Sequence, residues 1–314
     1  MVVDNFALTM HQACPAKYDL RIRNRWTSRR KSGALNFGAV LHEGLATYYR
    51  TGGDLPKALI SIKEHWTDDQ PADDFRTLEK CLRTMIDYAS HYGDENFTVL
   101  GFPENPLIEN HFTLDTGFYL PLCKACGHLH PRTEPVVYQN CSVCTAPLEH
   151  LEYGGIFDGV VVFAGRYFIL EHKTTTQLGA YYFDQYNPNN QVTGYIWAAR
   201  KLSGQPVGGA IINAIGIYKA SPTKFARQIT TRTDNQITEW LRNVWYEASE
   251  IQINEWNNYW PMRTGACTMY GKCEFHSVHS LANELERTRF LEQEFIKQEW
   301  DFVRRDEPGA TANG

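Results

Sequence analysis

The chain has 314 residues, of which 43% are hydrophobic and 21% charged, and its formal net charge is -5. This length and apolar content can bury a substantial core, so we expect one large domain or one domain with an insertion. The acidic balance argues against binding nucleic acid through overall basicity. The first residues lack the basic flank and apolar run of a signal peptide, and no segment approaches the roughly 18 apolar residues of a membrane span. We therefore expect a soluble intracellular protein.

The N-terminal region combines a short helix with a basic strip. A helix is predicted over residues 6–20, and it carries Cys14. Residues 17–31 hold seven Lys or Arg against one Asp, with two aromatic residues between them. Such a strip suits phosphate contacts and base stacking, and the alternative is a solvated basic loop. The candidate nucleic-acid contacts are Arg21, Arg23, Arg25, Arg29, Arg30 and Lys31.

Helical periodicity dominates the next part of the chain. An amphipathic helix is predicted over residues 35–49 and carries His42, and two more are predicted over 56–67 and 73–91. A lone histidine on such a helix is more often structural than a ligand. From residue 96 to 115 the pattern becomes strand-like and Pro-interrupted, and it contains Glu109.

Four cysteines follow in the spacing C-x2-C-x14-C-x2-C. They are Cys123, Cys126, Cys141 and Cys144. This spacing is typical of two knuckles that close a tetrahedral zinc site, and so short a segment has little core of its own. Two disulfides are the alternative, but they need an oxidising compartment. We therefore predict a zinc ribbon over residues 118–150, with His128 or His130 as less favoured substitute ligands.

A β-hairpin is predicted next. Two β-rich runs, residues 156–163 and 167–173, are joined by Ala-Gly-Arg. A two-residue loop at 164–165 would place Asp158 opposite Glu171, and Lys173 would project to the same face. A loop at 165–166 would instead place Asp158 opposite Lys173, and a three-residue loop without a bulge would separate the three side chains. Paired carboxylates beside a lysine suit Mg²⁺ and phosphodiester chemistry. The alternative is an ordinary cross-strand salt bridge.

The chain then continues through a helix, two strands and a longer helix. The helix between Asn187 and Gly204 places Gln191 and Tyr195 on one side at i, i+4 spacing. Residues 208–219 and 224–231 are β-prone, and an amphipathic helix is predicted from 234 to about 259.

Four motifs in this order resemble those of the RecB-type branch of the PD-(D/E)XK nucleases, over roughly residues 6–280. They are GAVLH ending at His42, GGIFD ending at Asp158, EHK from Glu171 to Lys173, and QVTGY from Gln191 to Tyr195. The resemblance implies that His42, Asp158 and Glu171 ligate Mg²⁺ or Mn²⁺ and that Lys173 serves the nucleophilic water. It further implies that Gln191 and Tyr195 support the site and the nucleic-acid strand. Glu109 is then either a supporting site residue or a surface carboxylate.

The resemblance also implies a metal clasp between the chain ends. Members of this branch, including bacterial recombination nucleases and CRISPR-associated exonucleases, often bind a [4Fe–4S] cluster through one N-terminal and three C-terminal cysteines. Cys14, Cys267 and Cys273 fit the first three places, but His279 stands where the last cysteine is expected, with His276 as the next choice. A Cys3His zinc site would use the same side chains, and only the resemblance favours iron–sulfur.

The resulting prediction is an α/β fold with a central mixed β-sheet flanked by helices and an inserted zinc ribbon. Residues 1–305 would form the nuclease domain with its ends joined by the clasp, residues 281–303 a charged helix within it, and residues 306–314 a disordered tail. The resemblance implies a phage or bacterial DNA exonuclease that acts on ends or single strands in recombination, repair or replication. Its expected location is the cytoplasm of a bacterium or phage-infected cell, with any helicase as a separate partner. An endonuclease, an RNA nuclease and a non-catalytic nucleic-acid-binding module stay open as alternatives.

Overall fold

A computed structural model describes residues 1–29, 33–67, 74–269 and 271–298. The chain divides into two compact units, each made of segments that are far apart in the sequence. Unit 1 takes Met1–Arg30, Thr113–Gly155 and Thr238–Arg305, and unit 2 takes Lys31–Phe112 and Ile156–Ile237. The predicted tail at 306–314 lies outside the described residues. No helix in the described part of the chain is long and apolar enough to cross a bilayer.

A mixed seven-stranded sheet forms the framework, in the order β1-β5-β6-β7-β8, with β3 and β4 also paired to β5. In unit 2, β6 (Arg166–Thr175) is antiparallel to β5 (His150–Phe163) and parallel to β7 (Gly209–Gly216). The sheet is completed there by β8 (Lys224–Thr231) and the short β3 (Phe97–Val99). All eight residues of β7 are buried, as expected for a strand inside a covered sheet. The predicted mixed sheet flanked by helices is confirmed.

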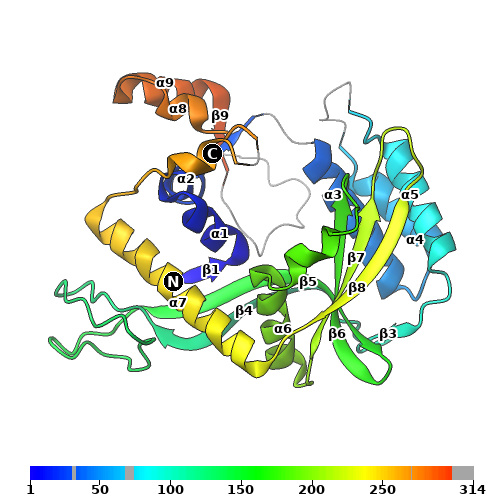
Figure 1. Cartoon of the computed structure of the whole chain (residues 1–314), viewed down its shortest axis with the longest axis horizontal. Coiled ribbons are helices and arrows are strands. Elements are labelled where there is room, and N and C mark those ends of the chain that lie inside the picture. The colour runs from blue at the N-terminus through cyan, green and yellow to red at the C-terminus, as the bar shows by residue number, and fades with distance from the viewer. Residues whose placement is uncertain (30–32, 68–73, 270, 299–314) are drawn as a thin grey trace. The chain divides into compact units, whose positions relative to one another are not determined.

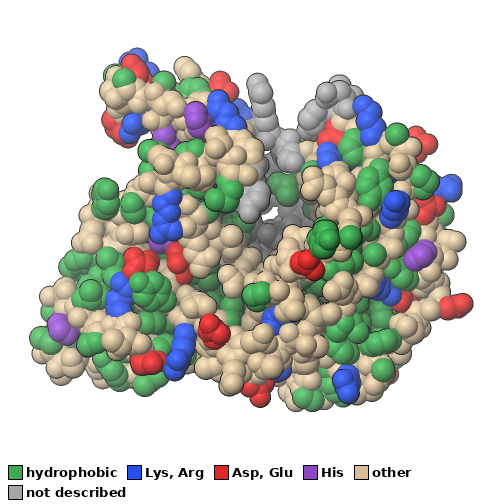
Figure 2. Space-filling view, viewed as in Figure 1, with side chains coloured by type: hydrophobic (Ala, Val, Ile, Leu, Met, Phe, Trp, Pro, Cys, Tyr) green, Lys and Arg blue, Asp and Glu red, His purple; other side chains and the backbone are tan. Residues whose placement is uncertain are grey.

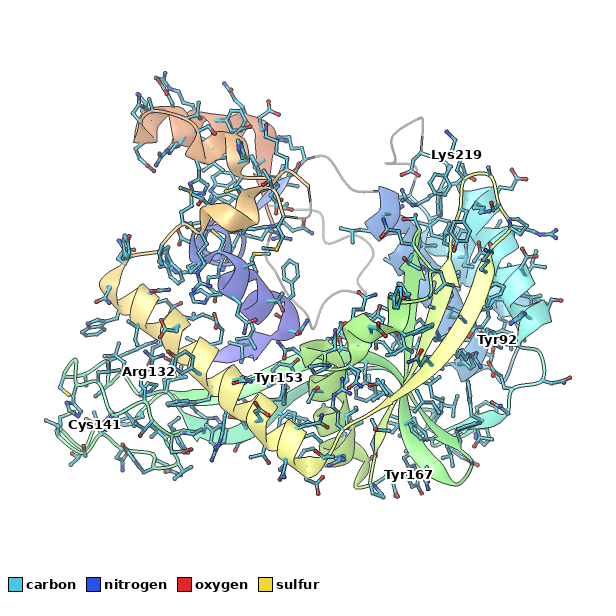
Figure 3. The ribbon with its side chains drawn as sticks, viewed as in Figure 1. Tyr92, Arg132, Cys141, Tyr153, Tyr167 and Lys219 are labelled. Atoms are coloured by element: carbon cyan, nitrogen blue, oxygen red, sulfur yellow. The ribbon has the colours of Figure 1, made fainter. Side chains whose placement is uncertain are left out.

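Of the hairpin loops that the sequence allows, the structure has the two-residue loop at residues 164–165. Phe163 pairs with Arg166, and Ala164 and Gly165 have φ angles of 48° and 71°. Two positive φ angles in succession are typical of the tight turn that matches the twist of paired strands. β6 and β7 are the two central strands of unit 2. In Figure 3, Tyr167 is labelled at the start of β6, and Lys219 is labelled just beyond the end of β7.

Helices of unit 2 cover this part of the sheet (Figure 1). α3 (Gly33–Arg50), α4 (Leu55–His65) and α5 (Leu78–His91) share one core with β6 and β7, in which Leu41, Leu45 and Met85 are fully buried. α5 begins five residues later than predicted because the Thr77 side chain accepts a hydrogen bond from the Lys80 amide and caps the helix there. α6 (Asn190–Ser203) packs against β6 and β7.

Unit 1 contains both ends of the described chain. β1 (Val2–Asp4) pairs in parallel with the first part of β5 and leads into α1 (Asn5–Ala13), which Asp4 caps. The predicted helix over 6–20 is interrupted, because Cys14 precedes Pro15 and is extended with φ -163°. The chain resumes as α2 (Pro15–Tyr18) and a π-helical turn, η1 (Asp19–Arg23). The start of the basic strip is therefore helical.

The C-terminal part of unit 1 differs from the predicted charged helix over 281–303. α7 (Asp234–Asn257) enters unit 1 at Thr238 and is followed by the short α8 (His276–His279) and by α9 (Glu284–Glu294). α9 ends at Glu294, and β9 (Phe295–Lys297) then pairs antiparallel with β2 (Trp26–Ser28). Phe295 is buried against Phe275 and Leu291, and this packing favours the strand over a continued helix. Strand β4 (Ile108–Tyr119), like β5, continues from one unit into the other.

Candidate active site and metal centres

Three side chains from different elements of unit 2 converge on one point. They are His42 of α3, Glu109 of β4 and Asp158 of β5, whose candidate ligand atoms all lie within 4.8 Å of one another. His42 Nδ1 is 3.3 Å from Asp158 Oδ1 and 4.0 Å from Glu109 Oε1. Glu109 has a φ of 50°, a left-handed conformation that costs roughly 1–2 kcal/mol outside glycine and is often found at functional sites. Glu109 is thus a member of the group rather than a remote surface carboxylate.

Both carboxylate oxygens of Asp158 have a partner. The backbone amide of His172 donates to Oδ2 at 2.6 Å, while Oδ1 faces His42. Burial favours protonation, but the charge and hydrogen bond of His42 and the charge of Lys173 outweigh it, and the pKa of Asp158 falls well below its usual range. Burial lowers the pKa of His42, but the negative charges of Asp158 and Glu109 raise it more, and the resulting pKa is about 9. The imidazole must release this proton before Nδ1 can ligate a cation.

Beside this group, four further predicted residues form a chain of contacts. Lys173 Nζ lies 2.6 Å from Glu171 Oε1 and donates to Gln191 Oε1 at 2.9 Å. The Gln191 amide in turn donates to the Tyr195 hydroxyl at 3.0 Å, across one turn of α6. The β5–β6 pairing ends at Gly159 opposite Leu170, one residue before Asp158 and Glu171, and beyond it the His172 amide of β6 donates to the Asp158 side chain. The structure thus links Glu171, Lys173, Gln191 and Tyr195 in one chain of contacts. Among the described residues, however, Glu109 and not the predicted ligand Glu171 joins His42 and Asp158 in the group of ligand atoms within 4.8 Å.

Glu171 is the best test of whether this site suits a divalent cation. The residue is 2% exposed, and its Oε2 atom is buried without a hydrogen-bond partner among the described residues. Burial raises the pKa of Glu171 above its usual range, although the charge of Lys173 lowers it. A buried carboxylate oxygen that lacks a partner is costly unless something binds it. Carboxylate oxygens and one imidazole are suitable ligands for Mg²⁺ or Mn²⁺, so the donor set fits such an ion.

A buried polar network next to the site could not be predicted from the sequence. The His172 ring contacts Asn213 through Nδ1 at 2.6 Å, and Arg227 Nε donates to Asn213 Oδ1 at 3.0 Å. Arg227 also binds both carboxylate oxygens of Glu95, at 2.6 and 2.7 Å. The available signal was Asn213 itself, the one polar side chain in the otherwise apolar strand GAIINAIG. Burial lowers the pKa of His172 to about 3, so its ring is neutral and supports the strand that positions Glu171 and Lys173.

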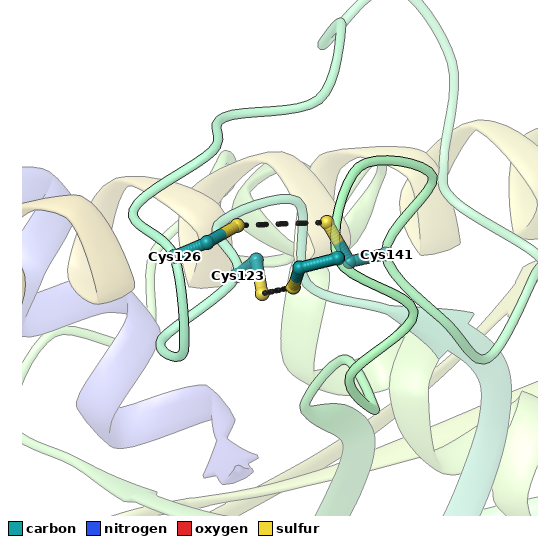
Figure 4. A group of neighbouring side chains, drawn as sticks. Cys123, Cys126 and Cys141 are labelled. Atoms are coloured by element: carbon teal, nitrogen blue, oxygen red, sulfur yellow. Dashed lines mark hydrogen bonds between the residues drawn. The ribbon is translucent and has the colours of Figure 1, made fainter.

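The four cysteines of the predicted ribbon form a second centre, in unit 1. Cys123 Sγ lies 3.5 Å from Cys144 Sγ, and Cys126 Sγ lies 3.8 Å from Cys141 Sγ (Figure 4). Zinc–sulfur distances of about 2.3 Å in a tetrahedron place the sulfurs about 3.8 Å apart, whereas a disulfide needs about 2.05 Å. Backbone amides, first that of Cys126, lower the pKa of Cys123 to about 7 and favour the thiolate. The donor set and spacing fit one tetrahedral ion.

Helix α7 supports this cysteine-bearing segment within unit 1. Gln252 is fully buried, and its side chain both accepts from the Leu122 amide and donates to the Leu122 carbonyl. Arg132 of the same segment forms an ion pair with Glu250 and lies over the Tyr246 ring. Arg132 and Cys141 are labelled in Figure 3. Neither His128 nor His130 belongs to the group of four thiols.

The proposed clasp residues lie in neighbouring segments but do not meet at one point. The Arg263 amide faces Cys14 Sγ at 3.4 Å, and the Cys273 amide donates to the Cys267 carbonyl at 2.8 Å. Among the described residues, no three ligand atoms from Cys14, Cys267, Cys273 and His279 lie within 4.8 Å of one another. To bind a single zinc ion, the four ligand atoms would have to lie closer to one another. The clasp therefore stays a prediction.

The basic strip makes contacts within unit 1. Arg23 pairs with Asp19 at 2.6 Å and lies over the Trp260 ring at 4.8 Å. Arg29 donates to the backbone carbonyls of Gln293 and Glu292. Arg30 and Lys31 lie outside the described residues. In the view of Figure 2, the described Lys and Arg side chains are scattered among acidic and apolar ones. A DNA-binding role for Arg21, Arg23, Arg25 and Arg29 stays a prediction.

Comparison with known proteins identifies a family and a similar fold. The sequence profile of the PD-(D/E)XK nuclease superfamily matches residues 7–278. A crystal structure of a candidate exonuclease from Eubacterium rectale is similar to this chain with a TM-score of 0.51 and 14% identity, covering 90% of this chain and 88% of that one. A structure of the protein SSO0001 covers 77% of this chain and 84% of its own, but its 9% identity and TM-score of 0.26 support no argument. No functionally curated protein matches the sequence.

Proposed function

Because this chain belongs to the PD-(D/E)XK nuclease superfamily, whose members use divalent metals, we propose that it is a Mg²⁺- or Mn²⁺-dependent deoxyribonuclease. Its substrates would be DNA ends or single strands, and its activity that of an exonuclease in recombination, repair or replication. The convergence of His42, Glu109 and Asp158 within 4.8 Å, with the buried Glu171–Lys173 pair beside them, is the observation that supports the proposal most. The RecB-type motif order supports assignment to that branch.

Each site residue has a role that follows from its contacts. His42, Glu109 and Asp158 would hold the cation, with Glu171 as the further carboxylate ligand that the family motif implies. When bound, the cation would polarise a phosphoryl oxygen and lower the pKa of a water. Lys173 keeps its positive charge, because Glu171 and Asp158 raise its pKa despite burial. It would stabilise negative charge that develops on the attacked phosphate and position the nucleophile, while Gln191 fixes its orientation.

Cleavage of defined nucleic acids tests this proposal. Labelled linear and circular DNA, single- and double-stranded, and a matched RNA are incubated with the full chain and Mg²⁺ or Mn²⁺. We expect degradation of linear DNA, little attack on closed circles, and no cleavage in EDTA. Cleavage of circles would instead indicate an endonuclease, and preference for RNA an RNA nuclease. DNA binding without any cleavage would favour a non-catalytic module.

For the clasp, we propose that Cys14, Cys267, Cys273 and His279 bind a [4Fe–4S] cluster that joins the N- and C-terminal segments of unit 1. Lys17 lies 3.6 Å from Glu274, and the Ala16 amide donates to the Pro261 carbonyl, so these segments are neighbours already. Protein purified anaerobically is expected to be brown, to absorb near ~400 nm and to lose this colour in Cys273→Ser. A colourless protein with two zinc ions per chain would contradict the cluster and favour Cys3His zinc.

The remaining predictions complete the proposal. Residues 118–150 would form the inserted zinc ribbon of a nuclease domain over 1–305, and the basic strip would contact DNA phosphates. A cytoplasmic location in a bacterium or phage-infected cell and a separate helicase partner agree with recombination chemistry and are proposed on the family resemblance alone.

A further inference from the structure

A row of three polar side chains crosses the sheet of unit 2 beside the candidate active site. Strand pairing places His172 of β6 opposite Asn213 of β7, and Asn213 opposite Arg227 of β8. Residues opposite one another in paired strands project to the same face of a sheet, so the three side chains share a face. Glu171 and Lys173 alternate with His172 along β6 and project to the other face. β6 thus carries site residues on one face and the first member of this polar row on the other.

His172 contacts two of the candidate metal ligands. Its backbone amide donates to Asp158 Oδ2 at 2.6 Å. Its ring lies edge-to-face with the His42 ring, with centroids 5.8 Å apart. Tyr49, two turns further along α3 than His42, stacks on the same ring with centroids 5.7 Å apart and planes 14° from parallel. One residue of β6 therefore contacts the carboxylate on β5 and, at two points, the helix that carries the imidazole ligand.

The orientation of the His172 ring follows from the donors and acceptors in the row. An arginine has no acceptor, so the 3.0 Å contact of Arg227 Nε with Asn213 must involve the amide oxygen of Asn213. The amide nitrogen then faces His172 Nδ1 at 2.6 Å and the Tyr88 hydroxyl at 2.9 Å, and it donates one proton to each. Nδ1 is therefore an acceptor, and the neutral His172 ring carries its proton on Nε2.

A buried ion pair holds the other end of the row. Arg227 binds both carboxylate oxygens of Glu95, at 2.6 and 2.7 Å. It also donates to the hydroxyls of Tyr49 at 3.2 Å and Tyr88 at 2.9 Å. The Tyr49 hydroxyl lies 2.6 Å from Glu95 Oε1, and both Asn213 and Tyr88 are fully buried. A buried polar network whose members are paired is rigid and favours one arrangement, so the row fixes α3 against β6, β7 and β8.

We propose that Asn213 is a positioning residue of the cation site. It fixes the ring of His172, and His172 in turn holds His42 and Asp158 in the relative positions that bind a divalent cation. This inference rests on the proposed metal-dependent nuclease function. Residues that orient metal ligands contribute to metal affinity without touching the metal. Asn213→Asp has nearly the same shape but presents an acceptor to Nδ1, so the His172 ring must then carry a proton on Nδ1.

The test measures Mn²⁺ binding to the full chain by isothermal titration calorimetry, with Asp158→Asn defining the binding outside the site. Asn213→Asp is expected to weaken the Asp158-dependent binding by about 10–100-fold. Tyr88→Phe removes one hydrogen-bond partner of Asn213 and is expected to weaken this binding by a smaller factor. Thr84→Val removes a fully buried hydroxyl of α5 that bonds the Lys80 carbonyl, and this matched control should keep the wild-type affinity.

The position of the proton on His172 is read independently from long-range ¹H–¹⁵N spectra of histidine-labelled protein. The wild type should carry it on Nε2, and Asn213→Asp should carry one on Nδ1. A wild-type proton on Nδ1 would overturn the inference, and so would an equal loss of affinity in Thr84→Val. Wild-type affinity in Tyr88→Phe and in folded Asn213→Asp would also overturn it, and Tyr88→Phe alone decides if Asn213→Asp does not fold. A wild type without Asp158-dependent Mn²⁺ binding would instead overturn the proposed function.

Discussion

Replacing Asp158 by asparagine is expected to reduce DNA cleavage by at least about 10³-fold. The substitution removes the charge that faces His42 at 3.3 Å, and with it one of the three ligands that meet within 4.8 Å. Asparagine keeps an oxygen that can accept from the His172 amide, so the strand pairing is preserved. The measurement is the single-turnover rate with saturating Mg²⁺ or Mn²⁺, because this rate reports chemistry without product release.

Two companion variants make this result interpretable. Asp87→Asn removes a carboxylate that pairs with Arg83 on α5 and is expected to leave the rate within 2-fold of wild type.

Lys173→Ala is expected to lower the rate by about 10²–10³-fold while metal binding is retained, since it removes charge stabilisation and not a ligand. Far-UV circular dichroism must match the wild type in each case. Full activity of Asp158→Asn would mean that the cation, if one is needed, binds elsewhere.

Removing the metal from the four-cysteine centre is expected to unfold residues 120–149 while leaving unit 2 folded. This segment contributes few buried apolar residues, so metal binding should supply much of its folding free energy. Structural zinc contributes up to about 10–16 kcal/mol in small zinc-binding peptides, which sets an upper bound here. The measurement is hydrogen exchange of the Cys141→Ser protein, in which amides such as those of Cys123 and Thr145 should lose protection.

A second cysteine variant is the control for the metal itself. Cys81 is fully buried in the core of unit 2 and does not belong to the group of four thiols. Cys81→Ala should destabilise unit 2 by about 1 kcal/mol and keep the wild-type metal content. Cys141→Ser should lose one metal ion per chain by elemental analysis. Unchanged metal content and unchanged protection in Cys141→Ser would show that the thiols do not hold a structural ion.

Local signals explain what could be predicted from the sequence. The Ala164-Gly165 loop fixes the register of the hairpin, in which Gly159 pairs with Leu170 next to Asp158 and Glu171. β8 has the predicted bounds, and α6 ends at Ser203 and is capped by the predicted Gly204, whose φ is 66°. These features depend on residues close together in the chain, where turn chemistry and alternation are informative.

Long-range packing explains what could not be predicted. The strand β9 has three residues and no periodicity of its own, and it forms because β2, far away in the sequence, pairs with it. In the sequence Glu109 is one carboxylate among many, because its place beside His42 depends on how β4 passes α3. Arg227 and Glu95 are ordinary charged residues in the sequence, and only the fold joins them to the buried Asn213. Pairing across distant segments leaves little trace in a single sequence.

The hairpin tip offers a consequence for protein engineering. Ala164 and Gly165 are exposed, while β6 is paired along its length with β7 as well as with β5. The pairing with β7 therefore holds β6 in register independently of the loop at the hairpin tip. An affinity tag, a fluorophore attachment site or new chain termini created by circular permutation should be accommodated there. Reporters fused at this position would leave the paired residues of β5 and β6, which carry Asp158 and Glu171, unchanged.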